Sequence, residues 1–122
     1  MRTRFPYKLV ILAAAACLSG QAAFAHAYLV KASPAAGSEV SGSPPALTLS
    51  YTGAVEPQFS TVAVRDANGN RVDDGAPEPS QDGRVLAVKL KPLPPGTYNV
   101  EWHATSVDTH KTEGHFSFTV KP

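Results

Sequence analysis

The sequence feature that most constrains the fold is a two-residue alternation of apolar and polar side chains in short segments. In residues 46–52, Leu47, Leu49 and Tyr51 alternate with smaller or polar residues, as in a strand with one buried face. Comparable segments occupy residues 26–32, 60–66, 84–90, 98–105 and 115–120. No window after residue 25 shows a sustained 3.6-residue period, so the pattern excludes a helical domain.

The stretches between these segments are rich in Pro, Gly, Asp and Ser. Residues 33–40 and 42–45 predict turns, Asn68-Gly69 predicts a hairpin turn, and residues 73–83 predict an exposed loop. Three aspartates of this loop do not have EF-hand spacing, so we expect them to be solvated. They are Asp73, Asp74 and Asp82. About seven short strands with regular turns predict an all-β antiparallel sandwich or barrel.

Residues 1–25 have the layout of a secretory signal peptide. Three basic residues precede a ten-residue apolar run, Leu9–Leu18, and Ala23-Phe24-Ala25 supplies a cleavage site. The run is shorter than the roughly 20 residues of a membrane span, which argues against a retained anchor. We therefore expect a periplasmic domain of residues 26–122. A rival cleavage before Cys17 would give a lipidated terminus and would leave His26 inside the chain.

Removal of this signal peptide, the leader, changes the net charge and the set of side chains that could bind a metal. Three of the 11 Lys and Arg residues lie in residues 1–25, so eight remain against ten Asp and Glu, a net charge of −2. This balance does not favour a nucleic-acid partner. The only Cys and the only Met, Cys17 and Met1, also leave with the leader. The remaining domain can form no disulfide and offers no sulfur ligand for a soft metal.

A candidate metal site combines the new amino terminus with a turn near the end of the chain. After cleavage, His26 presents its α-amine and its ring Nδ1, which together chelate one metal. Asp108 and His110 are two residues apart, and in an extended backbone their side chains leave the same side roughly 7 Å apart. Three nitrogens and one oxygen, without sulfur, suit Cu(II) better than other common divalent ions. The sequence thus predicts one Cu(II) ion on His26, Asp108 and His110.

Other interpretations of these histidines stay open at this point. Asp-x-His in a surface turn is usually ordinary solvated turn chemistry. His103 and His115 lie on the strand face opposite Trp102 and Phe116, which are predicted core residues. The two histidines are therefore either surface residues or supports that hold a metal ligand in place by hydrogen bonds.

Several motifs of residues 26–122 resemble the CopC/PcoC/YobA group of periplasmic copper-resistance proteins. They are the N-terminal His after a signal peptide, the S-x-P-x-x-G-S and P-G-T-Y turns, and W-x-x-x-S-x-D-x-H before a closing strand. The resemblance implies a seven-stranded Greek-key β-barrel related to immunoglobulin-like sandwiches, with a cupredoxin-like topology also compatible. It implies Cu(II) binding without catalytic turnover, through His26, Asp108 and His110. His103 and His115 match a branch in which both recur.

The resemblance also implies a role and a partner. The expected role is a copper carrier or buffer in homeostasis or resistance, delivering to a CopD-like inner-membrane protein. Some family members bind Cu(I) through a Met-rich loop, but residues 26–122 contain no Met, so a thioether Cu(I) site is not expected. Two rival functions remain. One is a histidine-brace copper monooxygenase, disfavoured because Asp108 would fill the oxygen position, and the other is a metal-free partner-binding sandwich.

Overall fold

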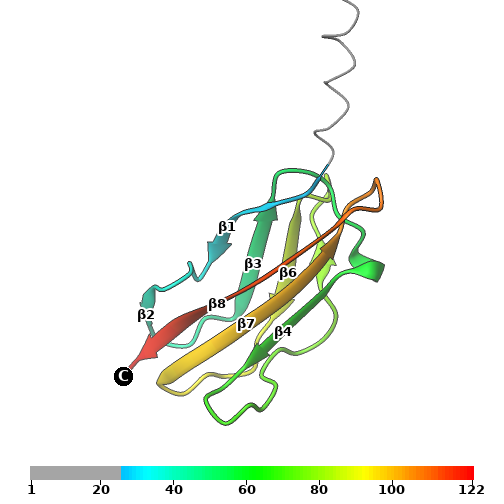
Figure 1. Cartoon of the computed structure of the whole chain (residues 1–122). Coiled ribbons are helices and arrows are strands. Elements are labelled where there is room, and N and C mark those ends of the chain that lie inside the picture. Colours follow the sequence, from blue (N-terminus) through cyan, green and yellow to red (C-terminus); the bar gives the residue numbers. More distant parts are fainter. Residues whose placement is uncertain (1–25) are drawn as a thin grey trace, which may run out of the picture.

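The computed structural model describes residues 26–122, which form two packed β-sheets (Figure 1). The predicted signal peptide and Cys17 lie outside the described residues. The strands are β1 (Leu29–Ser33), β2 (Glu39–Ser41), β3 (Ala46–Tyr51), β4 (Thr61–Arg65), β5 (Glu78–Pro79), β6 (Val85–Lys89), β7 (Gly96–Thr105) and β8 (Lys111–Lys121), and a short 3-10 helix, η3, spans Pro57–Phe59. One sheet has the order β1-β3-β6-β5 and the other β2-β8-β7-β4.

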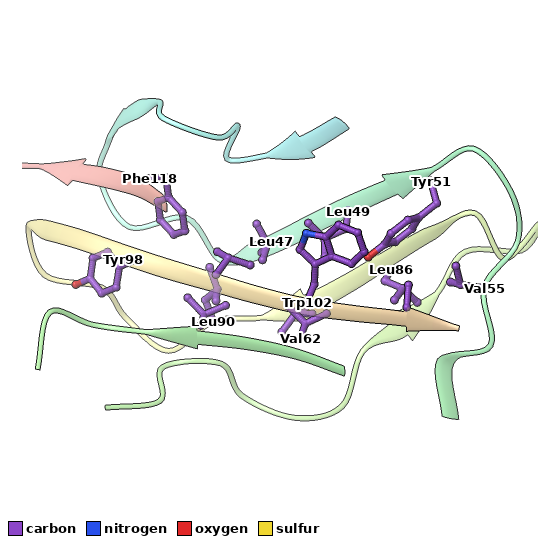
Figure 2. Close-up of a cluster of buried hydrophobic side chains, with 14 of the residues drawn as sticks. Leu47, Leu49, Tyr51, Val55, Val62, Leu86, Leu90, Tyr98, Trp102 and Phe118 are labelled. Carbon is purple, nitrogen blue, oxygen red and sulfur yellow. The ribbon is translucent and has the colours of Figure 1, made fainter. Parts of the chain in front are cut away.

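The core lies between the two sheets and is built by the alternation seen in the sequence. In β3, Leu47, Leu49 and Tyr51 are buried while the residues between them are partly exposed. Opposite them, β7 turns Trp102 inward, where its ring meets Tyr51 edge-on with centroids 5.5 Å apart. Figure 2 shows these side chains meeting between the sheets. Phe118 of β8 is fully buried in this core, and Trp102, whose place in the core was predicted, is buried as well.

The structure confirms the all-β sandwich and corrects its details. The two sheets are separate, so the strands form a sandwich and do not close into the predicted barrel. Within residues 26–122 the strands number eight, because short strands form where only turns and loops were predicted. Phe116, predicted as core, is half-buried and packs at the edge of the core. No helix among residues 26–122 has the length and apolar character needed to cross a bilayer.

The stretch predicted as turns at 33–40 contributes strand β2. Its residues pair in parallel with β8, with Glu39 beside Thr119 and Val40 beside Val120. The chain therefore passes from the β1 sheet to the edge of the other sheet. A three-residue strand carries too little alternation to reveal itself, and its parallel pairing breaks the antiparallel expectation.

Asp73 is not solvated, in contrast to the prediction, although Asp74 and Asp82 are exposed. Its side chain is only 6% exposed and meets the Arg71 guanidinium at 2.7 Å. The carboxylate also accepts a hydrogen bond from the Val64 N–H. Burial acts to raise the pKa of Asp73, but the bonds from Arg71 and Val64 outweigh it, and the net pKa is lowered. Asp73 thus ties its loop to β4.

Candidate metal site

The start of the described chain and the loop between β7 and β8 lie at the same end of the sandwich (Figure 1). Two threonines hold the first residues there. The Thr52 hydroxyl donates to the His26 carbonyl and accepts from the Tyr28 N–H, at 3.1 and 2.9 Å. The Thr112 hydroxyl, at the beginning of β8, donates to the Ala27 carbonyl at 2.8 Å. Because Ala27 is also buried, at 1% exposed, the backbone on which His26 sits is fixed against both sheets.

The loop that carries Asp108 is a three-residue hairpin connection. Ser106 and His110 close it through the Ser106 N–H and the His110 carbonyl, at 2.8 Å. Inside it, the Thr109 N–H donates to the Ser106 carbonyl, also at 2.8 Å. Thr109 has φ +74°, the left-handed conformation that such loops require at their third residue. The Val107 N–H also donates to the Ala54 carbonyl, and this bond holds the loop against the segment that follows β3.

This geometry brings Asp108 and His110 together by a different route from the one predicted. An extended backbone would have placed them side by side, but the left-handed Thr109 between them makes a turn. The turn directs the Asp108 carboxylate to within 3.0 Å of the His110 ring Nδ1. The β8 strand also begins at Lys111, earlier than the predicted start at residue 115.

Asp108 is held as an ionised acceptor. The Ser106 hydroxyl donates to it, with the His110 ring and the His110 N–H as further partners. These bonds lower the pKa of Asp108, led by the one from Ser106, so that the group is a carboxylate near neutrality. An ionised carboxylate beside an imidazole is the protonation state that a metal ion requires.

The His26 and His110 rings meet edge to face, with centroids 4.0 Å apart and planes at 83°. Of the three residues predicted to bind metal, the structure therefore brings all three into one cluster: His26, Asp108 and His110. The His110 side chain is 58% exposed and that of Asp108 is 26% exposed, so the cluster is open to solvent.

The cluster is not arranged as a finished coordination site. In residues 26–122, no three His, Asp, Glu or Cys side chains converge at metal-binding distances. The reason is visible in two contacts. The Nδ1 of His26 faces the Tyr28 hydroxyl at 3.2 Å, and the Nδ1 of His110 faces Asp108. The donor types fit Cu(II), and binding requires His26 to exchange its tyrosine contact for the metal.

His103 and His115 lie on the outer face of β7 and β8, as their positions in the sequence indicated. The His103 ring pairs with Glu113 at 3.4 Å, and both histidines are exposed. Among the hydrogen bonds and ion pairs of the described chain, none joins either histidine to the cluster. Their support of a metal ligand stays a prediction.

Sequence reasoning missed the residues that hold the cluster together. Thr52, Ser106 and Thr112 each make a side-chain hydrogen bond that fixes His26 or Asp108. The only available signal was the composition around Ser106 and Asp108, because serine and aspartate are both common in turns and form local hydrogen bonds there. The two threonines had no signal, because threonine is common in strands.

Fold and cluster together define a small β-sandwich protein that gathers two imidazoles and a carboxylate at one end. The CopC domain family matches residues 29–121. The chain is 39% identical over 117 residues to Protein YobA of Escherichia coli K12, covering 94% of this chain and 93% of YobA. It is 38% identical over 99 residues to the copper transport protein CutJ of Bacillus subtilis, covering 80% of this chain but 18% of CutJ.

A solved structure extends this likeness to the fold. The crystal structure of CopC from Methylosinus trichosporium OB3b superposes with a TM-score of 0.75 at 35% identity, covering 80% of this chain and 95% of that one. The chain belongs to the CopC family, whose members include proteins named for copper resistance and copper transport.

Proposed function

We propose that this chain is an exported Cu(II)-binding protein that carries or buffers copper in the periplasm. Cleavage after Ala25 frees the α-amine of His26, and one Cu(II) ion binds that amine, the His26 and His110 rings and the Asp108 carboxylate. The observation that carries the proposal is the 4.0 Å approach of the two rings. It joins the first described residue to the loop before the last strand, and the hydrogen bonds of Thr52 and Thr112 maintain it.

The approach of Asp108 to His110 supports binding over catalysis. A copper oxygenase needs an open position on the metal, as catalytic metal sites generally do. The Asp108 carboxylate, 3.0 Å from the His110 ring, would hold one of the positions on a metal ion bound here and leave less room for oxygen. We therefore propose a non-enzymatic role. Oxidation of a glycan by the copper-loaded protein and oxidant, absent without copper, would overturn it.

The recipient of the copper is proposed to be a CopD-like inner-membrane protein. CutJ supports this, because the matching segment forms only 18% of a longer protein named for copper transport. The open side of the cluster, where His110 is more than half exposed, gives a recipient access to the metal. A metal-free role for the sandwich predicts instead that Cu(II) leaves the thermal stability unchanged, since a ligand that binds only the folded state must raise it.

Intact mass of the exported protein, with and without Cu(II), tests both halves of the proposal. The expected mass begins at His26, and one tightly held Cu(II) is expected per chain. His26→Ala should lose that ion, whereas Glu39→Gln in β2, far from the cluster in sequence and fold, should keep it. A mature terminus elsewhere than His26, or an undiminished tight ion in His26→Ala, would refute the assignment.

A further inference from the structure

Four charged or ionisable side chains form a compact group on the outer face of the β7–β8 hairpin. In the strand register Glu101 lies opposite His115, and His103 lies opposite Glu113. Residues two apart on a strand share a face, so the two pairs are adjacent. We call this group the His–Glu square: Glu101, His103, Glu113 and His115. All four residues are exposed, and none belongs to the candidate metal site.

The square surrounds a shallow hollow of about 430 Å³ lined by its four residues and Gly114. Beside it, β4 places Thr61 next to His103 and Ala63 next to Glu101. These small side chains leave the hollow open on that flank. Gly114 lies opposite Trp102 and presses directly on its ring. The backbone under the square is therefore held by the core, while the side chains above it are free to turn.

The square supplies two imidazole nitrogens and two carboxylate oxygens. Imidazole and carboxylate together suit Zn²⁺ and Cu(II), whose bonds to these ligands are about 2.0–2.2 Å long. Opposite residues in such a ladder have Cβ atoms about 4.5–5.5 Å apart and diagonal residues about 7–8 Å. An imidazole reaches several ångströms beyond its Cβ, so the two diagonal histidines can close on one ion between them.

We propose that the His–Glu square is a second divalent transition-metal site, weaker than the His26 site and independent of the amino terminus. In the absence of metal, Nδ1 of His103 lies 3.4 Å from the Glu113 carboxylate. As described, the four side chains do not converge at metal-binding distances, so a metal ion has to draw them together and replace that contact. The His103 and Glu113 side chains are 51% and 76% exposed, so ordering them costs conformational entropy. The affinity is correspondingly lower than that of the chelating terminus.

The chemistry assigns the square a role as a second, readily exchanging metal position on the same protein. Its ligands all lie on the outer face of one hairpin, so it stays available whether or not the terminus is loaded. The proposal does not depend on cleavage after Ala25, because no member of the square is near residue 26 in the sequence.

Titration of the exported protein with Zn²⁺ alone and with Cu(II) alone tests the proposal separately from the His26 site. In His110→Gln, which disrupts the first site, one weaker Zn²⁺ equivalent should remain. Adding His103→Asn and His115→Asn should weaken that equivalent by about tenfold or more. The matched control is Ser117→Asn, on β8 beside the square, which should leave it unchanged.

Amide spectra locate the ion. Sub-stoichiometric Cu(II) added to His110→Gln should broaden the Gly114 amide and its neighbours, and this broadening should vanish in the variant that also lacks His103 and His115. Circular dichroism and melting temperature confirm that each variant folds. Absence of Zn²⁺ binding to His110→Gln, or equal binding after loss of both histidines, would overturn the second site while leaving the first untouched.

Discussion

The rings of His26 and His110 meet edge to face 4.0 Å apart, although one stands at the beginning of the described chain and the other just before its last strand. The contact depends on the meeting of the two sheets. Thr52 follows β3 of one sheet and Thr112 lies in β8 of the other, and both bond the backbone around His26. The sandwich thus positions the first described residues against the loop between β7 and β8.

Thr109 is a point of backbone strain in that loop. Its φ of +74° is unusual for a β-branched residue, and such conformations cost about 1–3 kcal/mol. Thr109→Gly should raise the free energy of unfolding by about 1 kcal/mol, after the added freedom of the unfolded chain is deducted. Urea unfolding measures this. Val107→Gly is the control, because Val107 lies in the same loop without a positive φ, and it should lower the free energy of unfolding. A similar decrease in Thr109→Gly would contradict the strain at Thr109.

Tyr51 has a buried hydroxyl with no hydrogen-bond partner among residues 26–122. Burial raises the pKa of Tyr51, as expected for a phenol without a partner that could stabilise its ionised form. An unsatisfied buried polar group costs about 1–3 kcal/mol. Tyr51→Phe keeps the edge-on contact with Trp102 and should raise the free energy of unfolding by about 1 kcal/mol. A clear loss of stability in urea unfolding would show that the hydroxyl has a partner.

Gly114 is packed too tightly against Trp102 to carry a side chain. A Cβ at Gly114 would lie 2.8 Å from Cζ2 of the indole ring. Overpacking of this kind costs about 1–3 kcal/mol, so Gly114→Ala should lower the melting temperature and shift the fluorescence of Trp102. Ser117→Ala, on the outer face of the same strand, is the control and should change neither. An unshifted melting temperature in Gly114→Ala would contradict the contact.

Asp73 gives the fold a defined sensitivity to acid. Its pKa is lowered in the folded state, so its contribution is fully present above the unfolded value of about 3.9 and is lost as pH falls through the folded value. At pH 7, Asp73→Asn should be less stable by about 1–2 kcal/mol, allowing for the half-exposed Arg71. The difference from the wild type should shrink at pH 3. Asp74→Asn, an exposed neighbour, should be neutral, and a difference that persists at pH 3 would count against the account.

The repeating alternation of the long strands could be predicted from the sequence, whereas single contacts between distant residues could not. The alternation of Leu47, Leu49 and Tyr51 recurs in each long strand, so the all-β sandwich followed from it. β2 escaped notice because three residues are too few to show a period. Asp73 was misplaced because its loop composition says nothing of a distant Val64 N–H. These contacts join residues far apart in the chain and leave no local pattern.

The candidate site, like the fold, could be predicted from the sequence only in part. The donor atoms of Asp108 and His110 could be recognised from the sequence, because they belong to the residues themselves. The expected amino terminus at His26 could be recognised as well. The turn that joins Asp108 to His110 could not, since it rests on a left-handed Thr109 where Gly or Asn is usual. The threonine bonds that hold His26 exist only once the two sheets have packed.

The most direct test of the central claim is the Cu(II) affinity of the protein beginning at His26, compared with a form that carries one additional alanine before His26. The extension keeps every side chain and converts the α-amine to an amide. We predict one tight Cu(II) equivalent in the first protein and its loss in the extended form. Equal affinity in the two would contradict the claim that the terminal amine and ring of His26 hold the copper.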